Sequence, residues 1–174
     1  MTTFIDVPET PYETAAAVIA ELTNSEVTLP AHCELLSATA VNIEFGTRSI
    51  SADEPRMLGG RGDAPTPGQY LLAALGSSAA ISFRYWSDRL GVRFDSLRIE
   101  LSGRFDLRGF IGLGDGVRPG FTDVRLTVNV SGPEPPDRYE ELKRAVERHC
   151  PVLDSLANRV AVAMILERID VRGR

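Results

Sequence analysis

Cys150 is the residue whose position best suits thiol chemistry. It lies between the predicted end of one helix and Pro151, which is placed like the first residue of the next helix. A thiol at a helix N-terminus is close to unpaired amide groups and to the positive end of the helix dipole, and both favour the thiolate. A free cysteine is more commonly a small buried hydrophobic residue, and a helix junction suits that role too. The sequence leaves both interpretations of Cys150 open.

A pair of serines, Ser77 and Ser78, interrupts an apolar stretch and suggests a serine nucleophile. The segment 76–80 loosely resembles the Gly-x-Ser-x-Gly turn of hydrolases, in which the serine follows a strand at a sharp turn. Here Thr66 and Pro67 begin a helix well before the serines, so the context is wrong. The favoured interpretation is small residues that allow close helix packing, with hydroxyls bonded to backbone carbonyls.

Two adjacent pairs, His32 with Cys33 and His149 with Cys150, are the candidate metal ligands. Neither pair has the i, i+3 or i, i+4 spacing that places two ligands on one face of a helix. A site built from all four residues would depend on how the chain folds. We therefore expect no metal site.

A long helix must position the serines. Thr66 and Pro67 with Gln69 have the pattern of an N-cap, a proline at the first helical position and a capping-box partner, and Leu90-Gly91 is a typical helix end. The first four turns carry no charged residue, so we expect this helix to be buried on all sides, under a sheet or between subunits. Two adjacent serines are unusual in such surroundings.

The remaining patterns predict strands and flanking helices. Residues 97–101 and 124–130 alternate apolar and polar side chains, which is typical of half-buried strands, and a glycine-rich connection over 108–120 separates them. A β-hairpin is predicted around Phe45-Gly46-Thr47, and a last strand over 160–171.

Helices are predicted at both ends of the chain. Thr10-Pro11 with Glu13 has the capping pattern of a helix that continues to about Leu22. Pro136 begins an amphipathic helix, which stops before Pro151, and a short helix follows. The apolar stripe of the amphipathic helix is expected to hold Tyr139, Leu142, Val146 and His149.

Composition restricts the class of protein. The 174 residues suit one domain with a short arm, and 43% hydrophobic with 25% charged residues is typical of a packed globular chain. The net charge is −5 and the arginines are scattered, so nucleic acid and anionic membranes are not expected partners. There is no signal-peptide pattern and no run near the ~20 apolar residues of a membrane span. We expect a soluble, cytoplasmic protein whose two cysteines are thiols.

Taken in order, the motifs over about residues 40–165 resemble the OsmC/Ohr superfamily of thiol-dependent peroxidases, which includes OsmC-like and organic hydroperoxide resistance proteins. The motifs that carry the resemblance are Ala52-Asp53-Glu54-Pro55, Leu58-Gly59-Gly60, Pro65-Thr66-Pro67, Leu71-Leu72-Ala73-Ala74-Leu75-Gly76-Ser77, Phe105-Asp106-Leu107-Arg108-Gly109, Pro119-Gly120-Phe121 and Cys150-Pro151-Val152. The resemblance implies an α+β fold in which curved antiparallel sheets wrap long central helices of an intertwined homodimer. Residues 1–33 would then be an N-terminal arm or helix, and 34–174 the OsmC-like domain.

The resemblance also implies a reaction. In the family, a peroxidatic cysteine attacks the hydroperoxide as a thiolate and becomes a sulfenic acid, a second cysteine resolves it as a disulfide, and an arginine held by a glutamate lowers the pKa of the thiol. A dithiol reductant closes the cycle, and no cofactor is needed. Carried over by position, Cys150 is the resolving cysteine, Glu54 the carboxylate and Arg48 the arginine, while the peroxidatic position holds Ser78.

The serine at position 78 departs from the family pattern. A hydroxyl is not ionised near neutral pH and cannot form a sulfenic acid, so peroxidase activity is doubtful in this chain. Three explanations are open: Ser78 is an engineered replacement of a cysteine, the chain is a non-redox relative that binds or transforms another small hydrophobic ligand, or Cys33 supplies the missing thiol.

Overall fold

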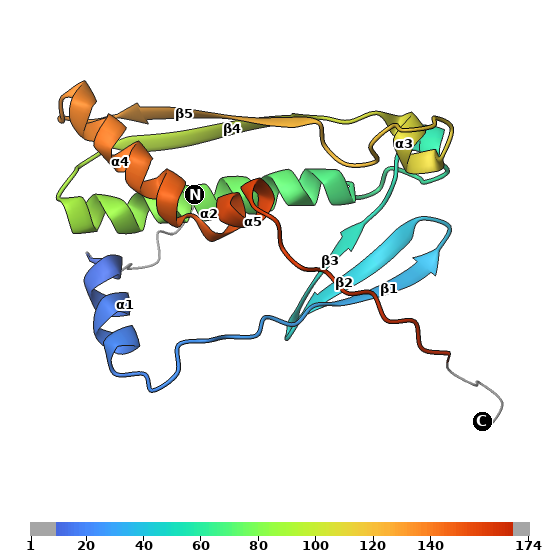
Figure 1. Ribbon diagram of the computed structural model, residues 1–174, viewed down its shortest axis with the longest axis horizontal. Helices are drawn as coiled ribbons and strands as arrows, with labels where there is room; N and C mark the ends of the chain where they lie inside the picture. The colour runs from blue at the N-terminus through green and yellow to red at the C-terminus, as the bar shows by residue number, and fades with distance from the viewer. Residues whose placement is uncertain (1–9, 169–174) are drawn as a thin grey trace.

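The computed structural model describes residues 10–168 as an α+β fold with two antiparallel sheets. In chain order the elements are α1 (Pro11–Ala20), β1 (His32–Ser37), β2 (Ala40–Phe45), β3 (Arg48–Ala52), a 3-10 turn (Arg56–Leu58), α2 (Pro67–Leu90), β4 (Ser96–Arg104), α3 (Leu107–Ile111), β5 (Asp123–Ser131), α4 (Pro136–His149) and α5 (Pro151–Ala157). Figure 1 shows β4 and β5 as a long ribbon along α2, with β1–β3 as a separate sheet.

The long central helix, α2, begins and ends where its capping residues predict. The Thr66 hydroxyl accepts a hydrogen bond from the Gln69 amide at 3.3 Å, and the Gln69 side chain accepts one from the Thr66 amide at 2.8 Å. Gly91 ends the helix in the left-handed conformation with φ 61°, which glycine adopts without strain.

Among the helices of residues 10–168, none combines the length and the hydropathy that a membrane-spanning helix needs.

The β4–β5 hairpin covers one face of α2. The strands pair from Ser96 opposite Ser131 to Arg104 opposite Asp123, and half-buried residues alternate with exposed ones along both. Gly76 allows the sheet to lie close to the helix, because a side-chain carbon at that position would lie 2.7 Å from Cδ1 of Leu101. The predicted alternation over 97–101 and 124–130 is confirmed.

The core lies where α4 and α5 pack on α2. Its buried cluster is made of Ala79, Phe83, Val92, Leu142, Val146 and Cys150. The predicted apolar stripe of α4 is correct for Leu142 and Val146, whereas His149 at the end of the helix is exposed. The difference arises because α4 ends at His149, and its ring packs against a neighbouring aromatic side chain rather than inside the core.

A short helix, α3, stands in the connection between β4 and β5, which the sequence predicted only as a glycine-rich segment. The Asp106 side chain caps it by accepting a hydrogen bond from the Arg108 amide at 2.9 Å. Gly112 then ends the helix with φ 73°. Five residues are too few for a periodic pattern, so the cap was the signal available in the sequence.

The N-terminal helix α1 is shorter than predicted and ends at Ala20. Thr10 precedes it, but its side chain makes no capping hydrogen bond, so the predicted capping box is wrong here. The helix packs on α2, where the rings of Tyr12 and Trp86 lie 6.4 Å apart at a tilt of 47°.

The sheet of β1, β2 and β3 carries apolar residues that are largely or partly exposed in one chain. Leu35 and Leu36 on β1 are 66% and 62% exposed, and Ile50 on β3 is 39% exposed. The predicted hairpin is confirmed, with Phe45 opposite Arg48 on either side of the turn.

The predicted last strand over 160–171 is absent from residues 160–168, which form no regular structure, and 169–171 lie outside the described residues. Val162, Met164 and Leu166 are 89%, 97% and 96% exposed. A strand needs a neighbouring edge for its backbone hydrogen bonds, and residues 160–168 pair with none in the described part of this chain.

Candidate functional site

Ser78 and Cys150 meet in the middle of the molecule. The Ser78 hydroxyl oxygen lies 3.3 Å from the Cys150 sulfur, and either group can donate the hydrogen bond. Ser78 comes from the centre of α2. Cys150 is the single residue between α4 and α5, and its amide donates to the Val146 carbonyl at 2.9 Å. The helix junction predicted around Cys150 is confirmed.

The two serines of α2 differ in their contacts. The Ser77 hydroxyl donates to the Ala74 carbonyl at 3.1 Å, which is the backbone hydrogen bond predicted for it. Ser78 contacts a thiol instead and is half-buried. Ser78 is therefore the serine that contacts the buried core, through Cys150.

Cys150 itself packs as a hydrophobic residue. Its side chain is 0% exposed and belongs to the same cluster as Leu142 and Val146. A dissolved oxidant has no direct path to a sulfur atom that is fully buried. In this conformation burial favours the packing interpretation of Cys150 over the reactive one.

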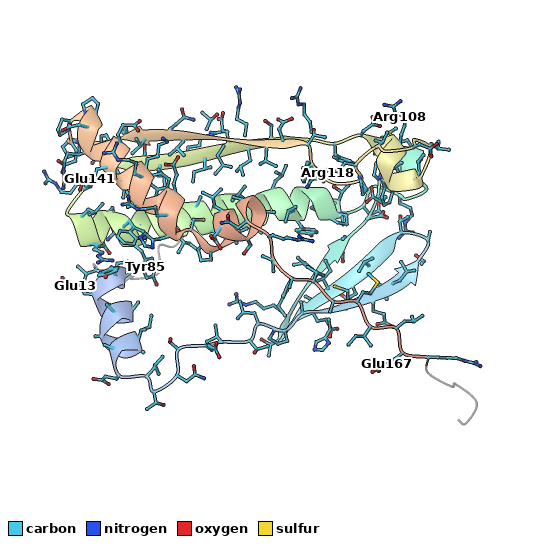
Figure 2. The ribbon with its side chains drawn as sticks, viewed as in Figure 1. Glu13, Tyr85, Arg108, Arg118, Glu141 and Glu167 are labelled. Atoms are coloured by element: carbon cyan, nitrogen blue, oxygen red, sulfur yellow. The ribbon has the colours of Figure 1, made fainter. Side chains whose placement is uncertain are left out.

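A pocket of about 530 Å³ opens beside Ser78. It is lined by Ala74, Ser77, Ser78, Ile81, Ser82, Tyr85, Trp86, His149, Pro151 and Val152. Figure 2 shows Tyr85 between α2 and α1, and this residue also lines a second hollow between those two helices. The lining combines apolar side chains with three serine hydroxyls from α2, which suits a small ligand that has an apolar body and a polar group.

His149 stands at the edge of this pocket, held by stacking. Its ring lies 4.3 Å from the ring of Trp86, with 19° between the planes. The Arg89 guanidinium lies 4.7 Å from the same Trp86 ring. Helical periodicity predicts His149 on a buried stripe, because the pattern does not tell a core position from a pocket edge at the last residue of a helix.

Glu54 lines a different pocket, of about 200 Å³, whose otherwise apolar lining includes Phe105, Phe110 and Phe121. Its carboxylate makes no hydrogen bond or ion pair with any described residue, and it does not line the Ser78 pocket. Within one chain, Glu54 and Ser78 therefore face separate hollows.

Asp53 holds the Glu54 loop in place. Its buried carboxylate accepts hydrogen bonds from the Thr39 hydroxyl at 2.6 Å, the Glu54 amide at 2.9 Å, and the amides of Arg61 and Gly62 at 3.0 Å each. These donors, the Thr39 hydroxyl above all, hold the pKa of Asp53 well below its usual range against the opposing effect of burial. This role of Asp53 was not predicted, although a carboxylate before a glycine-rich loop is a usable signal in the sequence.

Arg48 lies away from both pockets. It begins β3 next to the hairpin turn, and its side chain is exposed. It lines neither the Ser78 pocket nor the Glu54 pocket. Of the four predicted site residues, one chain brings together only Ser78 and Cys150.

The candidate metal ligands His32, Cys33, His149 and Cys150 do not form one cluster. No group of three or more histidine, cysteine, aspartate or glutamate side chains among residues 10–168 is arranged to hold a metal ion. His32 and Cys33 lie on β1, in the three-stranded sheet, and His149 and Cys150 lie at the α4–α5 junction.

Comparison with known proteins gives a family match and a set of shared folds. The family model described as OsmC-like protein matches residues 60–164, which is more than half of the chain. No functionally curated protein matches the sequence.

Several solved structures share the fold. An OsmC-like protein from Mycoplasma pneumoniae superposes with a TM-score of 0.67 at 15% identity, over 76% of this chain and 89% of that one. The organic hydroperoxide resistance protein OsmC from Legionella pneumophila gives 0.60 at 18% identity, over 76% and 91%. An organic hydroperoxide resistance protein from Elizabethkingia anophelis gives 0.59 at 14% identity, over 76% and 90%.

Proposed function

Because this chain belongs to the OsmC-like protein family, we propose that it has the frame of a thiol-dependent peroxidase of organic hydroperoxide metabolism, with Ser78 in the peroxidatic position. The contact between Ser78 and Cys150 carries the proposal. The reaction of the family needs two sulfur atoms close enough to form a disulfide. Ser78 Oγ lies 3.3 Å from Cys150 Sγ, so a sulfur atom at position 78 would lie close to the second sulfur.

The chemistry of the chain follows from the oxygen at position 78. In the family reaction, a thiolate attacks the peroxide bond, an alcohol leaves and the sulfur becomes a sulfenic acid. The resolving thiol then displaces water to form a disulfide, which an external dithiol reduces. A serine hydroxyl can take no part in these oxidation steps. The unmodified protein, with serine at position 78, therefore does not reduce hydroperoxides by this route.

Restoring the thiol tests the frame. Hydroperoxide consumption with a dithiol reductant is measured for the chain as written, for Ser78→Cys and for Ser78→Cys combined with Cys150→Ser. We expect activity only in the two proteins that carry Ser78→Cys, and slower recycling in the one that also carries Cys150→Ser. A Ser78→Cys protein that folds and remains inactive would overturn the proposal.

The same assay decides whether Cys33 supplies the missing thiol. Cys33 is exposed on β1, so its thiol is accessible to solvent. Activity in the unmodified chain that disappears in Cys33→Ser would assign the reacting thiol to Cys33 and contradict the proposal that position 78 is the peroxidatic position.

A second candidate function is the binding of a small hydrophobic ligand without redox chemistry. The observation that favours it is the Ser78 pocket itself, which has apolar walls and hydroxyls and no thiol among its lining residues. Binding of a medium-chain alcohol to the chain as written, lost on Ala74→Trp, which fills the pocket, would support this function. Equal binding to both proteins would exclude the pocket.

We also propose that the working unit is a homodimer. Ile81 is 60% exposed on the uncharged part of α2, and the apolar residues of β1, β3 and 160–168 are exposed as well. Exposed apolar surface on several elements at once is typical of an interface that a second copy covers. A second copy could also bring its own Glu54 and Arg48 to the Ser78 pocket.

A further inference from the structure

The helix α1 has an apolar stripe that its own chain covers only in part. Ala15, Val18 and Ile19 lie on one side of the helix, because they are three and four positions apart. Ala15 is half-buried, whereas Val18 and Ile19 are 58% and 55% exposed, and no residue of α1 is fully buried. A helix of ten residues is marginal in water by itself, so the second half of α1 needs a further neighbour.

The first turn of α1 is fixed on the C-terminal half of α2. The Tyr12 ring lies 6.4 Å from the Trp86 ring, and the Arg89 guanidinium lies 5.3 Å from the first ring and 4.7 Å from the second. Beside this contact is a hollow of about 570 Å³ between the two helices, which Val18 lines together with Ile81. Ile81 is also an exposed apolar residue of the dimer surface proposed above, so the stripe of α1 continues that surface.

The sheet of β1, β2 and β3 offers a second apolar surface. Cys33 lies opposite Ile43, and Ile43 lies opposite Ile50, so these residues share one face. That face includes Cys33, Leu35, Val41, Ile43, Phe45 and Ile50 and ends at Arg48, beside the turn. The alternate residues Glu34, Asn42, Glu44 and Ser51 form a polar face. An antiparallel sheet with one apolar face normally packs that face on a core, yet Leu35, Phe45 and Ile50 are exposed in one chain.

The surface area of the chain indicates how much a partner covers. The chain exposes 14274 Å², whereas a compact single chain of 19.0 kDa exposes about 8,400 Å². Allowing about 2,400 Å² for the residues outside 10–168 leaves an excess of roughly 3,500 Å². A standard interface buries only about 800 Å² per partner, and much larger ones belong to obligate homodimers and permanent complexes. The excess therefore favours a second copy that covers several elements at once.

We propose that the apolar stripe of α1 in one copy packs on the apolar face of the β1–β3 sheet in the second copy. The proposal rests on the homodimer of the previous subsection. Within one chain, α1 lies at the C-terminal half of α2, whereas the sheet is joined to the N-terminal end, where the Tyr70 hydroxyl donates to the Ser51 carbonyl at 2.6 Å (Figure 1). A two-fold axis that sets the two α2 helices antiparallel therefore brings α1 of one copy to the sheet of the other. Both surfaces precede residue 60, where the family match begins, so the contact does not follow from that match.

Cross-linking tests the contact directly, because Cys33 already lies on the apolar face of the sheet and is exposed. Val18→Cys places a second accessible thiol on the stripe of α1. With a short bismaleimide, we expect this protein to give a covalent dimer on a denaturing gel. Ala17→Cys is the matched control, because Ala17 is exposed on the opposite side of α1, and it should stay at the mass of one chain.

Val18→Cys combined with Cys33→Ser lacks one partner of the cross-link and should give no covalent dimer. A covalent dimer that persists in this protein would mean that the two α1 helices meet. A link within one chain, identified by mass spectrometry, would place α1 beside its own sheet. Either result would overturn the contact, and so would the absence of a covalent dimer in a Val18→Cys protein that sediments as a dimer.

The strength of the dimer gives a second measurement. Val18→Asp places a charge on the stripe, so we expect the dissociation constant of the dimer, from sedimentation at increasing dilution, to rise at least about tenfold. Ala17→Asp should change it by less than about twofold, because its side chain points away from the stripe. Equal constants for the two variants would contradict the role of the stripe. A monomeric unmodified chain would refute the homodimer and this contact with it, whereas the peroxidase frame depends on the separate Ser78→Cys assay.

Discussion

The Ser78 hydroxyl lies 3.3 Å from the Cys150 thiol, although 72 positions separate the two residues in the chain. The two partners differ in access. Cys150 is fully buried, whereas Ser78 is half-buried and lines a pocket. A ligand in that pocket would contact Ser78 and not Cys150, which contacts Ser78 from the buried side.

Cys150→Ala should destabilise the protein because it removes a fully buried side chain from the central cluster. We expect the free energy of unfolding, measured by urea denaturation, to fall by about 1–2 kcal/mol. Cys33→Ala is the control, since Cys33 is exposed on β1 and should change stability by less than about 0.5 kcal/mol. Equal effects of the two substitutions would contradict the core position of Cys150.

Asp53→Asn should reduce stability at pH 7 and do so less at pH 3. The folded protein holds the pKa of Asp53 below its usual value, so its carboxylate stabilises the fold above about pH 4 and loses this effect as the pH falls. Thermal melts of the two proteins should therefore differ more at pH 7 than at pH 3. Asp115→Asn, at an exposed aspartate outside this loop, is the control and should change the melting temperature at pH 7 by less than Asp53→Asn does. A gap for Asp53→Asn that widens on acidification would refute this account.

Thr66→Ala should cost about 1 kcal/mol of stability, because it removes the side-chain cap of α2. Thr10→Ala offers a matched comparison at α1, where the threonine side chain caps nothing. We expect the second substitution to change the urea midpoint little. A larger loss from Thr10→Ala than from Thr66→Ala would mean that the capping contacts are assigned wrongly.

Sedimentation should give the mass of a dimer. Ile81→Arg, which places a charge on the exposed apolar side of α2, should shift the protein towards monomer. Thr127→Arg, on the exposed face of β5, serves as the control and should leave the mass unchanged. A stable monomer for the chain as written would refute the dimer.

Much of the fold could be predicted from local patterns. The capping box at Thr66 and Gln69 and the left-handed Gly91 give the bounds of α2, and alternation identifies β4 and β5. These features depend on residues a few positions apart, so the sequence contains them directly. The proposed dimer, and the roles given to Glu54 and Arg48, stay predictions.

The sequence by itself determined the central helix, the strand pair and the cysteine at a helix junction, because each depends on neighbouring residues. Only the tertiary structure placed His149 at the Ser78 pocket and Glu54 in another hollow. It also left 160–168 without a strand, since β-structure needs an edge that the described part of one chain does not provide. Contacts between distant segments depend on how helices and sheets pack, and a local pattern does not record that packing.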